Sequence, residues 1–217
     1  MHDRPASAMG FDEADLRSRI GRMHPVEGVT AVRRSLWGDH VTEPSLASMI
    51  EGLTLRPAAV LIPLVLRESG TTVIFTRRND HMRAHAGQIA FPGGKIDPED
   101  GGPLVAALRE AEEEIGLDRR LVEPLGQLDS YISNSGYEIV PVVGLVQPDP
   151  PLQPNPDEVA DVFEVPLGFL MAPDNHLFEM REYKGLTRRV YAMPYEERRI
   201  WGVTAGIVRL FYEQVFA

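Results

Sequence analysis

The chain has 217 residues, of which 43% are hydrophobic and 25% charged, and its formal net charge is -10. Such values predict an ordinary soluble, globular, single-domain protein, and the negative charge argues against a nucleic-acid duplex as partner, because duplex binding needs a basic face. The absence of cysteine excludes disulfides, thiolate catalysis and cysteine-ligated zinc, and it fits a reducing compartment. A small phosphorylated substrate stays compatible with an acidic chain, because bound metal ions supply positive charge.

The first 50 residues are mixed in composition and rich in turn-forming residues, with one short helix expected over Asp12–Met23. They predict an N-terminal extension (1–50) packed on a domain formed by residues 51–217. The first ten residues lack the apolar stretch of a signal peptide. The longest apolar run, Ala58–Leu66, is too short to span a bilayer and contains Pro63. We therefore expect a cytoplasmic protein without a membrane partner.

The regular pattern begins with two strands, Ala58–Leu66 and Thr71–Thr76, joined by a hairpin turn over Arg67–Gly70. A short strand follows and leads into a glycine turn at Gly93 and Gly94, and a helix then ends at Gly116. The remaining expected elements, from the short strand onward, are Gln88–Phe91, the helix Leu104–Ile115, strands Leu121–Ser130, Glu138–Val146, Val159–Val165, Leu177–Tyr183 and Arg189–Met193, and a closing helix Thr204–Phe216. This order of strands and helices predicts an α/β sandwich.

A stiff loop interrupts the pattern at Pro148–Pro156, where five of nine residues are proline. Proline fixes the backbone φ angle, so this segment is extended. Its role is either a rigid surface connection or a contact to substrate, and the sequence leaves both open.

The helix Leu104–Ile115 carries acids on one face, because Glu110, Glu113 and Glu114 stand at i, i+3 and i+4. Carboxylates this close repel each other unless a cation lies among them. An apolar stripe on the same helix predicts its burial against a core: Leu104, Leu108, Ala111 and Ile115. A solvated helix face is the alternative explanation of the acids.

The acidic helix and the glycines before it resemble the signature of the Nudix hydrolases. In words, that signature is Gly, five residues, Glu, seven residues, then Arg-Glu-apolar-any-Glu-Glu-any-Gly-apolar. Its second half matches at every position of Arg109–Leu117. Its first half departs, since Asp100 stands where Glu is usual and eight residues, not seven, separate it from Arg109.

The resemblance implies a Nudix-type α/β/α sandwich with a mixed sheet, and hydrolysis of a nucleoside diphosphate linked to another moiety. It implies Mg²⁺ or Mn²⁺ as cofactor, held by Glu113 and Glu114, with Glu110 as a further ligand or the base that accepts a proton from water. Arg109 would orient a glutamate, and the two glycines would let the backbone turn tightly near the metals. A further acidic ligand would come from a later loop: the candidate is Glu158, with Glu196 and Glu197 as competitors.

A second motif lies upstream and resembles the coenzyme A pyrophosphatase branch of the family. Its matching residues are Thr76, Arg78, Arg83, Gly87, Phe91, Pro92, Gly93 and Gly94. Four later stretches also look like this branch: Ser130–Gly136, Val140–Gly144, Asn155–Val159 and Trp201–Ala205. The branch shares the Asp100 variant of the signature, so the departure supports the narrower resemblance.

The narrower resemblance implies cleavage of coenzyme A or acyl-CoA to 3′,5′-ADP and 4′-phosphopantetheine or its acylated form. Arg78, Arg83 and Lys95 would bind the substrate phosphates, since an arginine fork suits phosphate oxygens. The alternative for each basic residue is a solvated charge or an ion pair with the acidic helix. Two alternative functions stay open: a pyrophosphatase acting on ADP-ribose or NADH, and a nucleotide-binding Nudix protein without turnover. A homodimer is also left open.

Overall fold

The computed structural model describes residues 11–26, 37–43, 54–81, 86–183 and 186–217. Within these ranges, nine strands form one mixed sheet and three more form a second, smaller sheet. The strands of the large sheet are β1 (Trp37–Gly38), β2 (Arg56–Arg67), β3 (Gly70–Arg78), β4 (Ile89–Ala90), β5 (Gly93–Lys95), β6 (Val122–Gln127), β7 (Tyr131–Ile132), β8 (Tyr137–Val146) and β9 (Val159–Pro166). The small sheet consists of β10 (Leu177–Tyr183), β11 (Leu186–Tyr195) and β12 (Arg198–Trp201).

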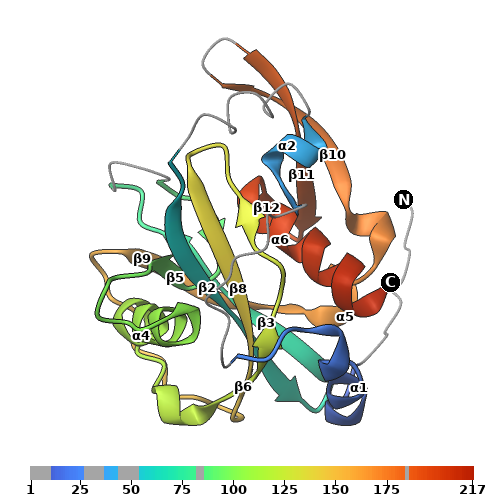
Figure 1. Cartoon of the computed structure of the whole chain (residues 1–217). Coiled ribbons are helices and arrows are strands. Elements are labelled where there is room, and N and C mark those ends of the chain that lie inside the picture. The colour runs from blue at the N-terminus through green and yellow to red at the C-terminus, as the bar shows by residue number, and fades with distance from the viewer. Residues whose placement is uncertain (1–10, 27–36, 44–53, 82–85, 184–185) are drawn as a thin grey trace.

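The helices lie on both faces of the large sheet, with α4 on one side and α6 on the other (Figure 1). The α-helices are α1 (Glu13–Ser18), α2 (Asp39–Thr42), α4 (Pro103–Ile115), α5 (Leu167–Leu170) and α6 (Val203–Phe211). Short 3₁₀ turns cover Ile20–Arg22, Arg119–Leu121 and Pro173–Asn175, and a π-helical turn at Tyr212–Phe216 continues α6. This arrangement is the α/β/α sandwich with a mixed sheet that the sequence predicts.

The centre of the large sheet is the parallel pair of β2 and β8, in which Arg56 lies opposite Tyr137 and Val65 opposite Val146. Both strands are buried over most of their length. Near-continuous apolar runs are typical of strands covered on both faces. The β2–β3 hairpin closes at the pair Arg67–Gly70, as predicted.

Strand β9 pairs antiparallel with β3, so that Val159 at its start lies opposite Arg78 at the end of β3. The two faces of the sheet build separate cores. The α4 face includes Leu61, Ile74 and Ile115, and the α6 face includes Phe75 and Ile207. Helix α4 packs against β2, β5 and β8. Of the predicted apolar stripe, Ala111 and Ile115 are fully buried and Leu104 and Leu108 are partly buried.

The structure changes three details of the predicted elements. The expected helix Asp12–Met23 is α1, which ends at Ser18, followed by a 3₁₀ turn that contains Gly21, a poor helix former. The expected closing helix is α-helical only as far as Phe211. The expected tight turn at Gly93 and Gly94 is wrong: both residues lie in strand β5, which pairs antiparallel with β2.

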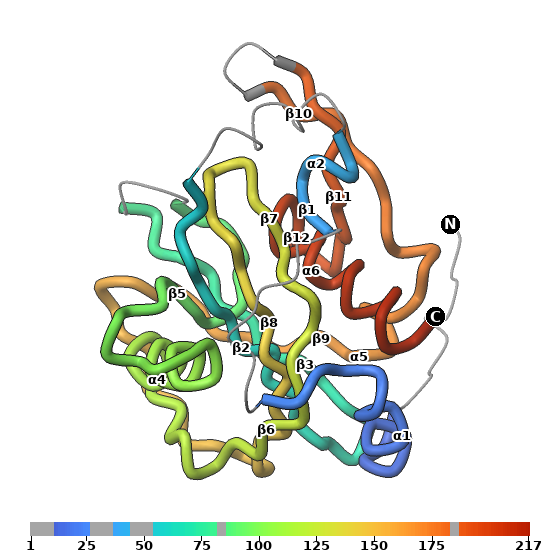
Figure 2. Tube along the Cα trace, viewed as in Figure 1, coloured from blue at the N-terminus to red at the C-terminus, as the bar shows by residue number. Residues whose placement is uncertain are grey.

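Residues 11–26 pack against the C-terminal end of the chain (Figure 2). Leu16 is buried in the core. Arg22 Nη1 donates to the carbonyl oxygens of Val215 (3.0 Å) and Ala217 (2.9 Å). The predicted domain boundary at residue 50 lies outside the described residues, so the division into extension and domain stays a prediction. In the described ranges, no helix combines the length and apolarity needed to cross a membrane.

Candidate active site

Helix α4 has a defined start and end, which fixes the position of its acids. Pro103 occupies its first turn, where the missing N–H costs nothing. Gly116 ends it in the left-handed conformation (φ 67°, ψ 20°). The Gly116 N–H donates to Glu112 O and the Leu117 N–H to Ala111 O, which satisfies the last carbonyls of the helix.

Glu114 is the buried acid of the helix, with only 3% of its surface exposed. Its carboxylate accepts a hydrogen bond from Arg78 Nη1 (3.3 Å) and another from the Gly93 N–H (3.3 Å). Burial raises the pKa of Glu114 to about 7, while Arg78 and Gly93 oppose the shift and Glu110 and Glu158 add to it. Glu114 therefore lacks enough positive charge nearby to stay fully ionised at neutral pH.

Glu110 lies against strand β5. A Cβ atom placed on Gly94 would stand 2.4 Å from Oε1 of Glu110. Glycine at position 94 is thus required by the close approach of the carboxylate to the backbone, and not by a turn. Burial is also the main cause that raises the pKa of Glu110, and the charges of Glu113 and Glu158 add to it.

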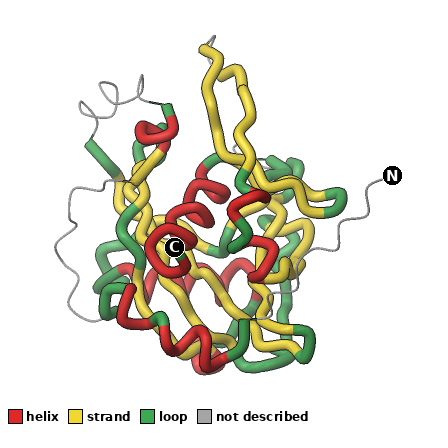
Figure 3. The backbone as a smooth tube through the Cα atoms, turned by 90° about the vertical axis from the view of Figure 1, so that its right-hand side faces the viewer, coloured by secondary structure: helices red, strands yellow, loops and turns green. Residues whose placement is uncertain are grey.

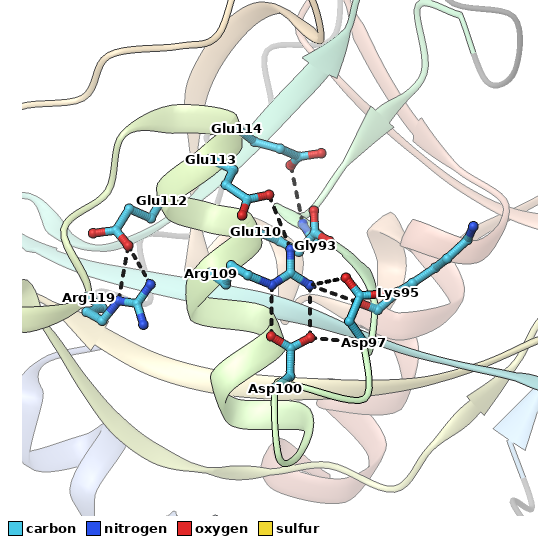
Figure 4. Close-up of polar contacts among 10 residues, drawn as sticks. All are labelled: Gly93, Lys95, Asp97, Asp100, Arg109, Glu110, Glu112, Glu113, Glu114 and Arg119. Carbon is cyan, nitrogen blue, oxygen red and sulfur yellow. Dashed lines mark hydrogen bonds and ion pairs between the residues drawn. The ribbon is translucent and has the colours of Figure 1, made fainter.

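Arg109 connects the helix to the loop before it (Figure 4). Its Nε and Nη2 donate to the two carboxylate oxygens of Asp100 at 2.8 and 2.9 Å, and Nη2 also donates to the Lys95 carbonyl at 3.1 Å. Its Nη1 donates to Glu110 (3.0 Å) and to Glu113 (3.2 Å). The predicted ion pair between Arg109 and a glutamate is present, and Asp100 is a further partner that the sequence did not predict.

The four glutamates of the helix have different surroundings. Glu113 is exposed over 57% of its side chain and reaches Arg109. Glu112 points away from the other acids and accepts hydrogen bonds from Arg119 (Figure 4). Glu112 is therefore the solvated acid of the helix, and the other three face the loop and β5.

Glu158 lies in the turn that leads into β9, next to the helix acids. The Asn79 N–H donates to Glu158 O (2.8 Å), which fixes the turn beside the end of β3. The Asn155 N–H donates to Glu114 O (2.9 Å), which fixes the same turn to the end of α4. The charge of Glu158 acts on both Glu110 and Glu114. The competitor Glu196, by contrast, lies exposed between β11 and β12, with Glu197 beside it.

The predicted substrate-binding residues are only partly brought together. Arg78 lies at the acids, in the ion pair with Glu114. Lys95 contributes its carbonyl to Arg109, while its own side chain is exposed and extends away from the carboxylates (Figure 4). Gly93 is required where it stands, since a Cβ there would lie 2.5 Å from the Ala59 carbonyl oxygen. Arg83 lies outside the described residues.

The chemistry of this donor set fits a hard cation. Carboxylate oxygens are the ligands that Mg²⁺ and Mn²⁺ prefer, and the charges of Glu110 and Glu158 raise the pKa of Glu114, although Arg78 and Arg109 form ion pairs with Glu114 and Glu110. Among the described residues, no three acidic or histidine side chains already enclose a metal position. Arg109 Nη1 binds both Glu110 and Glu113 in this arrangement.

Comparison with known proteins identifies the family of this site. The family model of the NUDIX domain matches residues 55–184. The chain belongs to the Nudix family. This Nudix protein is 46% identical over 162 residues to the uncharacterized Nudix hydrolase NudL of Yersinia pestis (strain Pestoides F), a match that covers 75% of this chain and 81% of the relative. NudL of Yersinia pseudotuberculosis serotype I (strain IP32953) matches with the same identity and coverage.

Solved Nudix structures are more distant from this Nudix protein. RenU, a Nudix hydrolase from M. smegmatis, has 22% identity and a TM-score of 0.46, and the match covers 55% of this chain and 74% of that one. A MutT/nudix family protein from Enterococcus faecalis has 14% identity and a TM-score of 0.46, with 93% and 74% covered. Such distant likenesses say nothing about substrate. Family membership makes the protein a hydrolase that acts on pyrophosphate bonds.

Proposed function

We propose that this Nudix hydrolase cleaves the pyrophosphate bond of coenzyme A or acyl-CoA. The products would be 3′,5′-ADP and 4′-phosphopantetheine or its acylated form. The observation that carries the proposal is the ion pair between Arg78 and Glu114, whose Nη1 and Oε1 atoms are 3.3 Å apart. Arg78 belongs to the motif that resembles the coenzyme A branch, and Glu114 to the Nudix signature. The pair thus joins the substrate motif to the acids of the reaction.

The cofactor in this proposal is Mg²⁺ or Mn²⁺, held by Glu110, Glu113, Glu114 and Glu158. The raised pKa values of Glu110 and Glu114 support it, because they reflect negative charge that burial and neighbouring acids leave without enough compensation. When bound, the ion supplies positive charge that neutralises the phosphates and lowers the pKa of a bound water.

The protein's own side chains orient the reactants and move the proton. Glu110 is half-buried and has a raised pKa, which suits a carboxylate that accepts a proton from the attacking water. Arg109 limits the positions of Glu110 and Glu113 through Nη1, while its Nε and Nη2 are fixed by Asp100. Arg109 is thus a positioning residue for the acids.

Substrate binding in this proposal uses Arg78, Arg83 and Lys95, together with the backbone at Gly93 and Gly94. Coenzyme A carries a 3′-phosphate in addition to its pyrophosphate, so it needs cationic groups beyond the metal ions. Arg78 is the one placed closest to the acids in the described part of the motif. The planar guanidinium of Arg78 can bind phosphate oxygens in place of the Glu114 carboxylate, because the two groups have a similar geometry. The cytoplasmic location and the lack of nucleic-acid and membrane partners remain predictions from the sequence.

Product analysis by chromatography tests the proposal. The protein is incubated with coenzyme A, dephospho-coenzyme A, ADP-ribose or NADH, each with Mg²⁺ or Mn²⁺ and each beside a chelator control. We expect metal-dependent release of 3′,5′-ADP and 4′-phosphopantetheine, with coenzyme A cleaved fastest. Preferred cleavage of ADP-ribose or NADH would agree with hydrolase activity but contradict coenzyme A as the substrate. Cleavage that persists in the presence of chelator would contradict the proposed requirement for metal ions.

A further inference from the structure

The hairpin of β10 and β11 projects from the body of the protein (Figure 3). Strand β10 is the first strand of the small sheet and pairs with β11 along all of Leu177–Tyr183 without a register shift. In the described part of the chain its other edge has no strand partner. An edge strand presents N–H and C=O groups ready to pair with another strand.

Strand β10 also exposes large apolar side chains. Met180 is 63% exposed, Leu177 47% and Phe178 42%. Phe178 and Met180 share one face of the strand, because side chains alternate between faces. Phe178 is held in place from its own sheet, by Arg189 at 3.5 Å from the ring centroid and by the Tyr191 ring at 4.4 Å. This edge lacks a proline and a bulge, two of the devices that protect exposed edges, and its protection is limited to the charged side chains Glu179, Arg181 and Glu182.

The charges on β10 select one partner, a second copy of the same strand. In a symmetric antiparallel pair, a two-fold axis passes through one residue, and residues equally far from it lie opposite each other. With the axis at Met180, Glu179 lies opposite Arg181 of the second copy, and this occurs twice. Within its own sheet Glu179 already contacts Arg199 and, at 3.7 Å, Arg181, so the new pairs extend an existing group of opposite charges. With the axis at residue 179 or 181, two glutamates or two arginines would face each other. Opposite charges directly across a strand pair stabilise it and like charges destabilise it, so the register centred on Met180 is favoured.

The net charge of this region also permits association of two copies. Residues 177–201 contain six basic and four acidic side chains, whereas the whole chain has a net charge of -10. Two copies that meet through this region therefore bring together their less acidic parts, and the repulsion between the strongly negative remainders is reduced by distance and by salt.

We propose that this protein forms a homodimer through antiparallel pairing of β10 with β10 of a second copy, centred on Met180. The two small sheets then become one continuous sheet. Phe178 and Met180 of both copies line up on one face of it, and diagonal neighbours on the same face are within reach of aromatic and long side chains. The proposal is independent of the substrate of the enzyme.

The test is the oligomeric state of the full-length protein, measured by sedimentation velocity. Concentrations from about 1 to 200 μM cover the weak association expected of a small interface. We expect a concentration-dependent dimer. Met180→Lys places two ammonium groups at the axis and removes the apolar contact, so the dimer dissociation constant should rise by at least about tenfold. Val105→Lys is the control, because Val105 is 42% exposed on α4, far along the chain from the hairpin.

A charge exchange tests the register. Arg181→Glu should weaken the dimer, because it puts glutamates opposite each other twice. The triple variant Glu179→Arg, Arg181→Glu and Arg199→Glu should recover it, since opposite charges then face each other across the two copies and within each sheet, where Glu179 pairs with Arg199. Far-UV circular dichroism and hydrolase activity verify that each variant is folded. A monomer at all concentrations, a dimer that Met180→Lys leaves unchanged, or a triple variant as weak as the single one would overturn the proposal.

Discussion

Arg109 and Asp100 form a two-point ion pair, with Nε–Oδ1 at 2.8 Å and Nη2–Oδ2 at 2.9 Å. The Asp100 side chain is 5% exposed, and the hydrogen bonds from Arg109 lower its pKa. Asp100 occupies the place where the Nudix signature has a glutamate, and one extra residue separates it from the arginine. The shorter side chain and the longer spacing still produce a bidentate pair. The departure seen in the sequence is thus compatible with a closed, ordered loop.

Removal of the Arg109–Asp100 ion pair should lower the free energy of unfolding of the protein. Asp100→Ala leaves the half-buried Arg109 without its main partner, and we expect a loss of about 2–3 kcal/mol in the free energy of unfolding. Urea denaturation in chelator measures it. Asp97→Ala is the matched control, because Asp97 is 59% exposed and lies 3.6 Å from Arg109, and such pairs contribute about 0–1 kcal/mol. Equal losses in both variants would contradict the role given to Asp100.

The helix acids should differ in their effect on turnover. Glu113→Gln or Glu114→Gln should lower kcat by roughly 10²–10⁴-fold, the range for loss of a positioned catalytic group. Glu112→Gln should stay close to wild type, because Glu112 points to Arg119. Steady-state kinetics with saturating metal ion compares the three variants. Near-normal rates for Glu113→Gln and Glu114→Gln together would mean that other residues hold the metal ions.

Gly94→Ala should impair catalysis with little effect on stability. The new methyl group would lie 2.4 Å from Glu110 Oε1, the mobile end of a flexible side chain, so the carboxylate moves and the backbone stays. A displacement of this size can cost about 10²-fold in rate. Gly21→Ala is the control, since nothing lies within 4 Å of a Cβ there. A thermal melt measured beside kcat separates the two effects, and a large drop in melting temperature with normal kcat would contradict the prediction.

The buried Glu114 should make the stability of the metal-free protein depend on pH. Its pKa is about 7 in the folded protein, compared with an ordinary value of 4.5, so the folded state binds the proton more tightly. Protonation of Glu114 therefore contributes on the order of 3 kcal/mol to the free energy of unfolding below about pH 4.5, and this contribution is lost as the pH rises to about 7. The difference between wild type and Glu114→Gln in urea denaturation, followed from pH 4.5 to 7.5 in chelator, isolates this group. A difference that does not change with pH would show that Glu114 is ionised throughout.

Glu158 should matter for metal affinity. Glu158→Gln should weaken Mn²⁺ binding by at least about tenfold, a typical effect of changes at metal sites. Asp157→Asn is the matched control, since this neighbouring acid is exposed on the same turn. Isothermal titration with Mn²⁺ in the absence of substrate measures the affinities. An unchanged Mn²⁺ affinity of the Glu158→Gln variant would show that Glu158 is not a metal ligand.

The sequence predicted the parts of the site that depend on local spacing. Periodicity placed Glu110, Glu113 and Glu114 on one helix opposite an apolar stripe, and Gly116 marked the end of the helix. The long strands were predicted because β-branched and apolar residues accumulate in them. These features require only short-range patterns.

Features that depend on tertiary contacts were less accessible. The sequence predicted Glu114 as a metal ligand on the acidic face of the helix but did not distinguish its burial from that of Glu113, and Glu114 is buried because the end of the helix packs against Arg78 and β5. The glycine pair reads as a turn, yet Gly94 is needed for the close approach of Glu110. The partnership of Asp100 with Arg109 shows in the sequence only as a conservative departure from the signature. Long-range packing decides each of these, and no local pattern encodes it.

The turn before β9 is attached to its surroundings largely through the main chain. The N–H groups of Asn155 and Asn79 donate to the carbonyl oxygens of Glu114 and Glu158, and the Asn79 side chain donates to the Pro156 carbonyl oxygen. All the groups that the turn itself contributes to these bonds belong to its main chain, so the bonds do not depend on which side chains the turn carries. The proline-rich loop that precedes the turn can therefore change its sequence during evolution while Glu158 keeps its place beside the helix.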